Sequence, residues 1–227
     1  MTPRPAPSID VVRRRARVAY EIGRARVGAL RALPLVALVA IATAGASAGQ
    51  GRPAPSLTGQ LLVATDALRD PRFVYTLIYM FQHDAKGATG LVVNRPVAEV
   101  ALADFLARFG VDSQGVSGRI RVHYGGPVEP SRVFVLHTED YAGAATRVIK
   151  DGVALTTDPE VLEAMGRGKG PRRSLFVFGY AGWAPGQLEG EMRGGYWVSV
   201  PADQGLLFDD DHERKWERAM AQRRIEL

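Results

Sequence analysis

Cysteine is absent from this 227-residue chain. Without thiols the protein can form no disulfide framework, no iron–sulfur cluster and no thiolate zinc site, and it has no cysteine nucleophile. Histidine is scarce, and its four positions show neither an H-x-x-x-H nor an HExxH spacing: His83, His123, His137 and His212. Because zinc needs three or four converging ligands, we predict no metal site, and no motif indicates a cofactor.

Signatures of catalysis and of phosphate binding are also missing from residues 57–227. This part of the chain contains no G-x-S-x-G nucleophile elbow and no G-x-x-x-x-G-K-[ST] phosphate loop. The run His137-Thr-Glu139 matches half of the zinc-deaminase signature, whose other half requires cysteines. The residues therefore identify no reaction. Whether the protein is an enzyme stays open, and a non-enzymatic role is favoured.

The apolar run of the N-terminal segment is shorter than a helix that crosses a membrane, which needs about 20 apolar residues. It covers residues 33–44, follows an arginine-rich stretch and precedes Ala46-Ser-Ala48. Basic, apolar and small-residue parts in this order are typical of a secretory signal. An uncleaved membrane anchor is one alternative. A translation start further downstream, so that this segment is never made, is another.

The positive charge of the chain is confined to its N-terminal segment. The chain has a formal net charge of +5, whereas residues 1–56 alone carry +7 from nine arginines and two acidic residues. Residues 57–227 therefore have a net charge of −2. A mildly acidic domain gives no support for a phosphate-binding face, so direct nucleic-acid binding is disfavoured.

Composition divides the chain into two parts. Residues 1–56 are predicted to be a signal-like or membrane-anchor leader that ends in a loose linker, and residues 57–227 to be the folded domain. The leader predicts an exported or membrane-anchored protein that contacts a membrane through this segment. A cytoplasmic location is the alternative if translation starts downstream.

Hydrophobic periodicity in residues 57–227 predicts an irregular mixture of strands and helices, which is typical of an α+β domain with a mixed sheet. An Asp-Gly pair at 151–152 indicates a tight hairpin turn. Three acidic residues at 209–211 are expected to cap a terminal helix. We expect strands at 61–65, 73–81, 91–93, 119–124, 133–137, 147–155 (a hairpin), 174–178 and 195–200, and helices at 98–109, 158–165 and 209–224.

A glycine-rich loop from Gly179 to Glu189 is the chemical focus of the domain. It follows a predicted strand and enters a short predicted helix, whose free N–H groups attract carboxylate or phosphate. One hypothesis is that this loop binds a small ligand or a peptide, and another is that it is the site of an enzyme of unknown class. The candidate residues for both are Gly179, Tyr180, Gly182, Trp183, Gln187 and Glu189. The alternative, which we favour, is that the glycines permit a tight turn and Trp183 fills the core.

A second candidate is the basic cluster in residues 166–173. As a hypothesis, its side chains contact phosphate or anionic lipid, and they give a nucleic-acid-binding alternative: Arg167, Lys169, Arg172 and Arg173. The favoured interpretation is a solvated loop before a buried strand.

Several short segments occur together in an order that resembles the AlgH/YqgE family of bacterial proteins. The resemblance covers residues 57–227 and rests on Asp70-Pro-Arg-Phe73, Gly90-Leu-Val-Val-Asn-Arg-Pro96, Tyr124-Gly-Gly-Pro-Val128, Phe134-Val-Leu-His137, the Gly179–Glu189 loop and Leu207-Phe-Asp209. It implies one compact α+β domain around a mixed, partly barrel-like sheet flanked by helices. It also implies a putative regulator of transcription without a defined biochemical activity.

The resemblance implies no particular ligand. We expect a protein or small-ligand partner that the sequence does not identify, and the oligomeric state stays open. Members of this family usually begin close to the first strand, so the N-terminal leader departs from the pattern. This departure conflicts with a cytosolic regulatory role.

Overall fold

The computed structural model describes residues 55–223, and the predicted leader lies outside this range. Its strands are β1 (Gln60–Ala64), β2 (Leu77–Asp84), β3 (Gly87–Val92), β4 (Pro96–Ala101), β5 (Arg119–Tyr124), β6 (Val128–Thr138), β7 (Thr146–Lys150), β8 (Val153–Thr156), β9 (Ser174–Trp183) and β10 (Trp197–Pro201). Its helices are α2 (Leu102–Arg108), α3 (Glu160–Gly166), α4 (Gln187–Arg193), α5 (Gln204–Phe208) and α6 (Lys215–Gln222).

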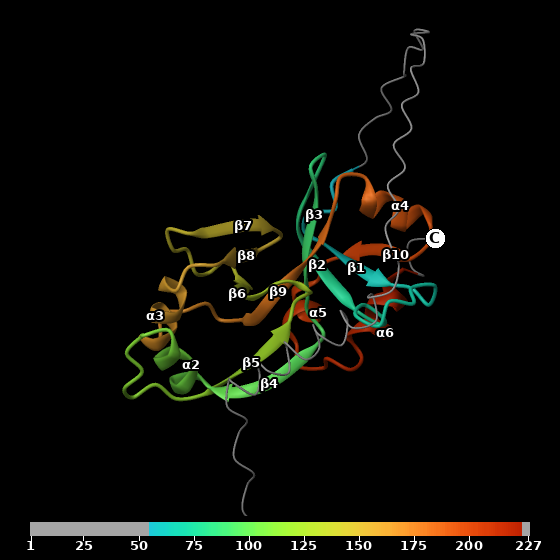
Figure 1. Ribbon diagram of the computed structural model, residues 1–227. Coiled ribbons are helices and arrows are strands. Elements are labelled where there is room, and N and C mark those ends of the chain that lie inside the picture. The colour runs from blue at the N-terminus through green and yellow to red at the C-terminus, as the bar shows by residue number, and fades with distance from the viewer. Residues whose placement is uncertain (1–54, 224–227) are drawn as a thin grey trace, which may run out of the picture.

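The strands form one strongly curled sheet (Figure 1). Its main path runs β10-β1-β2-β3-β9-β6-β8-β7, and β5 joins it by pairing with β9, while β4 pairs with β5. The β5–β9 pair is parallel and the other pairs are antiparallel, so the sheet is mixed. The predicted fold class, a single α+β domain with a partly barrel-like mixed sheet, is therefore confirmed.

Strand β9 joins the two halves of the curled sheet, and it changes neighbours at Gly179. Before this residue, Phe176 lies opposite Val122 of β5; after it, Ala181 lies opposite Gly90 of β3. Gly179 has a φ of 71°, and a Cβ added there would lie 2.5 Å from the carbonyl oxygen of Gly126. The close crossing of two backbones at this point requires glycine.

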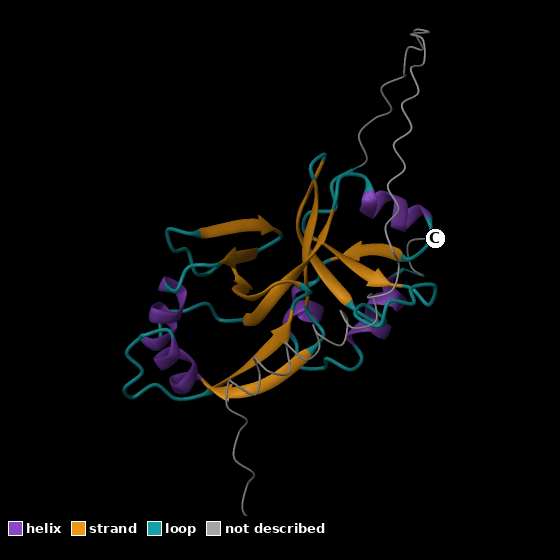
Figure 2. Ribbon diagram, in the orientation of Figure 1, coloured by secondary structure: helices purple, strands orange, loops and turns teal. Residues whose placement is uncertain are grey.

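The helices are short: α2 and α3 lie together at one end of the curled sheet and α4 near the other, while α5 and α6 contribute to its largest core cluster (Figure 2). Helices α2 and α3 pack on each other, α4 contacts β3 and β10, and α6 contacts β1 and β2. Three groups of buried apolar side chains lie beneath them, one with Phe105 of α2, one with Leu188 of α4 and one with Ala219 of α6. Among residues 55–223, no helix combines the length and the apolar character needed to cross a membrane.

Three secondary-structure predictions need correction. Residues 73–76 form a turn instead of the start of a strand, with Tyr75 at a φ of 56°. The segment predicted as a helix from residue 98 begins as β4, because pairing with β5 satisfies its backbone, and becomes helical only at Leu102. The terminal helix predicted at 209–224 begins only at Lys215, as α6, and α5 precedes it at Gln204–Phe208. Asp209 lies between the two helices and binds Lys215 and Arg218 instead of capping a helix.

Candidate functional site

The corner between β9 and α4 is not the continuous loop that the sequence predicts. Residues Gly179–Trp183 belong to β9, and only Ala184–Gly186 connect the strand to helix α4. The strand continues because its last residues pair with β3, with Trp183 opposite Ala88. Side chains of successive strand residues point to opposite faces, so the candidate residues of this corner are distributed to different sides.

A pocket of about 190 Å³ lies beside this corner. Four separate segments contribute to it: the turn before β2, the connection between β5 and β6, the end of β9 with α4, and the start of β10. It is lined by Asp70, Arg72, Phe73, Pro127, Ala181, Gly182, Trp183, Gln187, Glu191 and Trp197. The exposed surface of the pocket is mainly polar, because Trp183 and Trp197 lie largely beneath it.

The carboxylate of Glu191, in the lining of this pocket, accepts three hydrogen bonds. Its Oε2 accepts hydrogen bonds from the indole Nε1 atoms of Trp183 at 2.9 Å and Trp197 at 2.8 Å. Its Oε1 accepts a hydrogen bond of 2.8 Å from Nε2 of Gln187, one helical turn earlier. All three donors are neutral, and no Lys or Arg of residues 55–223 forms an ion pair with Glu191, so its negative charge is not cancelled.

An ion pair between Asp70 and Arg72 stands on the other side of the pocket. The guanidinium donates to both carboxylate oxygens, at 3.0 Å from Nε to Oδ1 and 2.5 Å from Nη2 to Oδ2. Hydrogen bonds from Arg72 keep the pKa of Asp70 below its usual value, and Asp70 in turn raises the pKa of Arg72. Arg95 fixes this turn by donating to the carbonyl oxygens of Arg72 and Val74.

The lining of the pocket is therefore negative overall. Asp70 and Arg72 cancel each other, and Glu191 adds one uncompensated negative charge. Glu191 is half-buried, so water still screens part of this charge.

The six candidate residues of the corner have separate roles in the structure. Gly182, Trp183 and Gln187 line the pocket, as the ligand-site interpretation requires. Gly179 is buried at the backbone crossing. Tyr180 packs edge-on against the ring of Phe134, and its hydroxyl donates to Glu129 at 3.2 Å. Trp183 is also largely buried, at 8% exposure, so the interpretation that it fills the core describes part of its role.

Glu189 lies away from the pocket and pairs with His83. The backbone N–H of Leu57 donates to Nδ1 of His83, which places the ring proton on Nε2, and Nε2 donates to Glu189 at 3.0 Å. Hydrogen bonds from its own backbone N–H and from His83 keep the pKa of Glu189 below its usual value. Both ring nitrogens of His83 are thus occupied, and the pair anchors the beginning of the described chain.

The candidate residues from the sequence include only three of the ten that line the pocket and leave out Glu191, Trp197 and Phe73. One signal was available, because Gln187 and Glu191 are four residues apart and hence lie on the same side of a helix. No local pattern could have placed Trp197 and Phe73 opposite them, since these two residues belong to other strands and turns.

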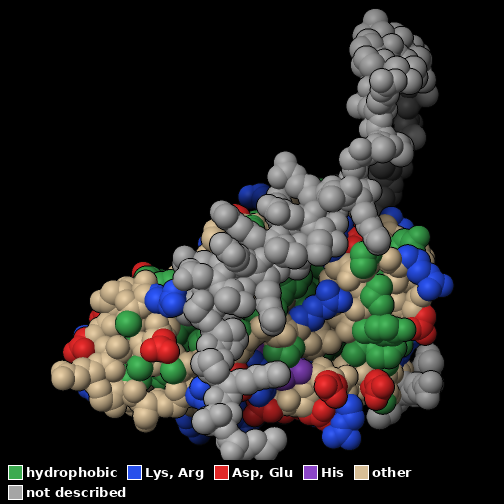
Figure 3. All heavy atoms as spheres, turned by 60° about the horizontal axis from the view of Figure 1, so that its bottom comes forward, with side chains coloured by type: hydrophobic (Ala, Val, Ile, Leu, Met, Phe, Trp, Pro, Cys, Tyr) green, Lys and Arg blue, Asp and Glu red, His purple; other side chains and the backbone are tan. Residues whose placement is uncertain are grey.

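The basic cluster does not form one positive surface. Arg167 pairs with Glu163 at 3.3 Å, and Arg172 pairs with Asp140 at 2.9 Å. Lys169 and Arg173 are exposed on the connecting loop. On the face drawn in Figure 3, Lys and Arg side chains likewise lie among Asp and Glu side chains. This arrangement does not favour the nucleic-acid alternative.

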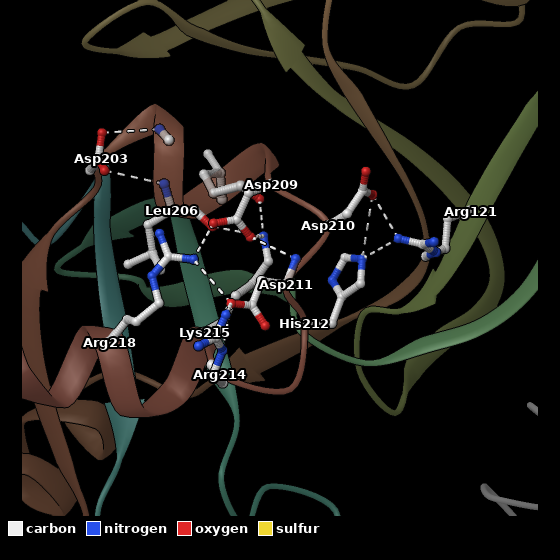
Figure 4. A network of polar contacts seen from close by, with 12 residues as sticks. Arg121, Asp203, Leu206, Asp209, Asp210, Asp211, His212, Arg214, Lys215 and Arg218 are labelled. Carbon is white, nitrogen blue, oxygen red and sulfur yellow. Dashed lines mark hydrogen bonds and ion pairs between the residues drawn. The ribbon is translucent and has the colours of Figure 1, made fainter.

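A second polar cluster joins β5 to the C-terminal helices (Figure 4). Arg121 donates to Asp210 at 2.6 Å and to Nε2 of His212 at 2.8 Å. The ring of His123 lies 4.9 Å from that of His212, is fully buried and has no hydrogen-bond partner at either nitrogen. Within residues 55–223, no group of three or more histidines and carboxylates is placed to hold a metal ion.

This cluster predicts a loss of stability in acid. Burial, together with nearby His212 and Lys215, lowers the pKa of His123 from 6.5 to about 3. Between pH 6.5 and 3, His123 is therefore protonated in the unfolded chain and neutral in the folded chain. Its contribution to the free energy of unfolding is complete above pH 6.5 and declines as the pH falls toward 3.

We expect the free energy of unfolding of the wild-type protein to fall by up to about 1.4 kcal/mol per pH unit in this range on account of His123. In His123→Phe this part of the slope should be absent, whatever the absolute stability of the variant. Urea denaturation at a series of pH values measures both slopes. Equal slopes for the two proteins would show that His123 is protonated in the folded state.

Comparisons with known proteins agree with the fold described above. Residues 61–227 match the family model DUF179, described as AlgH-like. A UPF0301 protein of Caulobacter vibrioides is 49% identical over 167 residues, 73% of this chain and 86% of that protein. A UPF0301 protein of Rhodospirillum rubrum is 44% identical over 164 residues, 72% of this chain and 85% of that protein.

Solved structures support the same assignment. The solution structure of the AlgH protein from Pseudomonas aeruginosa matches with a TM-score of 0.62 and 35% identity, covering 77% of this chain and 92% of that chain. A crystal structure of a Corynebacterium diphtheriae protein shares the fold, with a TM-score of 0.57 and 20% identity over 75% of this chain and 88% of that one. The relatives' names assign neither an enzymatic nor a regulatory activity. From the family match over most of its length and the identity to its relatives, this chain belongs to the AlgH-like, UPF0301 family.

Proposed function

We propose that this domain is a non-enzymatic binding module whose ligand site is the pocket between the Asp70–Phe73 turn, helix α4 and strand β10. The observation that carries the proposal is the carboxylate of Glu191, which two indole N–H groups hold at the edge of the pocket. Preorganised polar groups among apolar walls orient a ligand and give specificity.

The hydrogen bonds and ion pairs of the polar side chains in the pocket favour binding over catalysis. Every carboxylate and guanidinium of the lining already holds a protein partner, as in the Asp70–Arg72 pair and the Glu191 cluster. The nearby histidine, His83, uses both ring nitrogens for Leu57 and Glu189 and so has no free nitrogen to act as a base. In this proposal, a regulatory role of the protein would depend on ligand occupancy instead of direct contact with DNA.

The three tryptophans of the chain provide a direct test. The indole N–H groups of Trp183 and Trp197 point at Glu191, whereas that of Trp216 donates to the carbonyl oxygen of Ala64 on the sheet. We expect at least one compound from a mixed set of small cations, anions and neutral molecules to shift the NMR signals of the first two indoles and to leave the third in place. Trp216→Phe identifies the control signal.

Binding should also stabilise the folded protein. A ligand at about tenfold its Kd raises the free energy of unfolding by about 1.4 kcal/mol, which a thermal melt detects as a higher Tm. The proposed function fails if no compound of any charge class moves the signals of Trp183 and Trp197. It also fails if the compounds that raise the Tm move the signal of Trp216 alone.

A further inference from the structure

We propose that the pocket binds an extended peptide with a basic side chain, one residue of which pairs with the open edge of strand β9 at Gly182. This inference rests on the proposed function and names the chemical class of its ligand. It depends on three properties of the pocket: an unpaired strand edge, a glycine at that edge, and a small, mainly polar surface of negative charge.

The last residues of β9 are paired on one edge only. Strand β3 covers that edge as far as Trp183, which lies opposite Ala88. On the other edge, pairing with β6 reaches only to Tyr180, which lies opposite Val128, the first residue of β6. Beyond Tyr180, no strand among residues 55–223 pairs with this second edge. Three residues of β9 thus end the strand beside an uncovered edge.

The backbone N–H and C=O groups of Gly182 point toward this open edge. In an antiparallel pair, successive residues direct these groups alternately toward the partner strand and away from it. The carbonyl oxygen of Trp183 faces β3, because a Cβ added to Gly87 of β3 would lie 2.3 Å from it. Gly182 therefore directs its own donor and acceptor away from β3. Both groups are accessible, since Gly182 is exposed and lines the pocket together with Pro127, the residue before β6.

The glycine at position 182 lets a second backbone come close. A Cβ added there would lie 3.6 Å from the Tyr180 ring and 3.9 Å from Val128, so the fold has room for a side chain. Packing within the domain therefore does not require glycine at this position, in contrast to Gly179. Glycine inside a strand often marks a site where another backbone or a ligand approaches closely.

The open edge is one residue long, which makes the contact with the peptide short. The following residue, Ala184, donates its N–H to Oε1 of Gln187, and its carbonyl oxygen accepts from the N–H of Gln187, each at 3.0 Å. Gly182 is thus the residue with both groups available. One residue of an extended peptide can donate its N–H to the Gly182 carbonyl and accept from the Gly182 N–H, as in the addition of a strand to a sheet edge.

The surface, size and charge of the pocket indicate which peptides fit. Its exposed surface is mainly polar, as a peptide backbone requires of its partner, and its volume of about 190 Å³ is below the roughly 300 Å³ at which pockets for drug-sized molecules begin. Asp70 compensates the charge of Arg72, whereas the hydrogen-bond donors to Glu191 are all neutral. A basic side chain is therefore favoured over an acidic one. Because the contact is short, we expect an affinity on the order of millimolar.

The test compares three ligands of the same length: the capped tripeptide acetyl-Ala-Lys-Ala-amide, its analogue with esters in place of all backbone amides, and acetyl-Ala-Glu-Ala-amide. Each is titrated into the full chain while NMR follows the backbone N–H signal of Gly182 and the indole signals of Trp183, Trp197 and Trp216. We expect the basic tripeptide to shift all of these in a saturable way except that of Trp216.

The ester analogue has no N–H to donate to the carbonyl oxygen of Gly182, so its affinity should be at least about fivefold lower. The acidic tripeptide keeps the backbone groups but brings a like charge near Glu191. Water screens part of this repulsion, so we expect an affinity about threefold lower than that of the basic tripeptide.

Hydrogen exchange tests the open edge without any ligand. In the free protein, the N–H of Gly182 should exchange faster than those of Ala181 and Trp183, which pair with β3. Saturation with the basic tripeptide should slow the exchange of Gly182. If the N–H of Gly182 is as protected as its two neighbours in the free protein, the edge is closed and the peptide inference is wrong, whatever else the pocket binds.

Two variants of helix α4 separate the charge preference from the backbone pairing. Glu191→Gln keeps an oxygen that can accept from the indoles but removes the charge, so the basic and acidic tripeptides should bind it equally, while the ester analogue stays weaker. Glu189→Gln is the matched control, because Glu189 is on α4 but faces His83. It should bind all three ligands as the wild-type protein does.

The outcomes distinguish the two proposals. If the ester analogue or the acidic tripeptide binds as tightly as the basic tripeptide, the pocket binds ligands but the inference of a basic peptide paired with Gly182 is wrong. The same conclusion holds if the peptides fail and small molecules still shift the signals of Trp183 and Trp197. If the Gly182 signal shifts with protein concentration alone, the edge pairs with a second copy of the chain and the inference is wrong. If nothing of any class binds, the proposed function fails with it. The comparison of ligands uses only the wild-type chain, so poor folding of Glu191→Gln does not prevent a decision.

Discussion

Gly179→Ala is expected to lower the free energy of unfolding by roughly 2–5 kcal/mol, because it adds both backbone strain and a steric clash. The φ of 71° at this residue is costly for any side chain, and the new Cβ would lie 2.5 Å from the carbonyl oxygen of Gly126. Neither backbone can move freely, because Gly126 is packed as tightly as Gly179. A Cβ added to Gly126 would lie 2.1 Å from the carbonyl carbon of Tyr180. Urea denaturation measures the change.

Gly182→Ala, three residues further along the same strand, is the matched control. An added Cβ there has only ordinary contacts, at 3.6 Å from the Tyr180 ring and 3.9 Å from Val128. Its φ is not in the left-handed region, so a loss of less than about 1 kcal/mol is expected. Similar stability of the two variants would mean that the strand can shift at Gly179 and that the backbone crossing is not required for the fold.

Lys215→Met is the second change with a large expected effect, a loss of about 3–5 kcal/mol in the free energy of unfolding. The side chain of Lys215 is fully buried, and its Nζ donates to the carbonyl oxygens of Leu206 and Leu207 at 2.7 Å each. These carbonyls belong to the last turn of α5, where no helical N–H follows to satisfy them. Asp209, at 3.4 Å, supplies the opposite charge.

Methionine has a similar length but cannot donate a hydrogen bond. The substitution would leave two carbonyl groups and the carboxylate of Asp209 without their buried partner (Figure 4), and uncompensated buried polar groups are costly. Burial lowers the pKa of Lys215, and the carboxylates of Asp209 and Asp210 oppose this shift.

Lys169→Met, in the exposed loop after α3, is the control and should change stability by less than about 0.5 kcal/mol. Thermal and urea melts of both variants measure the difference. A Lys215→Met protein as stable as the control would show that the α5–α6 segment contributes little to the folded state.

Turns and strands whose pattern lies in residues adjacent along the chain were predicted correctly from the sequence. The hairpin at Asp151-Gly152 forms with φ values of 51° and 77°, as its turn residues require. Strand β5 matches its predicted residues because its alternation of side chains is strict. The segment at residues 98–101 was predicted wrongly, since its helical spacing is overruled by pairing with β5, a contact that depends on residues about twenty positions away.

The candidate site shows the same division. The sequence directed attention to the end of β9 and to α4, and Trp183 and Gln187 do line the pocket. It did not separate Glu189 from Glu191, although the two face different partners, His83 and the indoles. Residues two positions apart on a helix point in different directions, and which direction meets the pocket is decided by how α4 packs on the sheet.

The sequence by itself determined the absence of thiol chemistry, the concentration of positive charge in the N-terminal segment beside a mildly acidic domain, and the resemblance to the AlgH/YqgE family. These properties depend on composition and on the order of short segments along the chain. Only the tertiary structure decided where the pocket lies and what charge it carries. The pocket forms because β9 continues past Gly179 to pair with β3, which brings Trp183 beside Trp197 and the Asp70–Phe73 turn. Contacts between segments so far apart in the chain have no local signature, because they arise from the packing of the whole sheet.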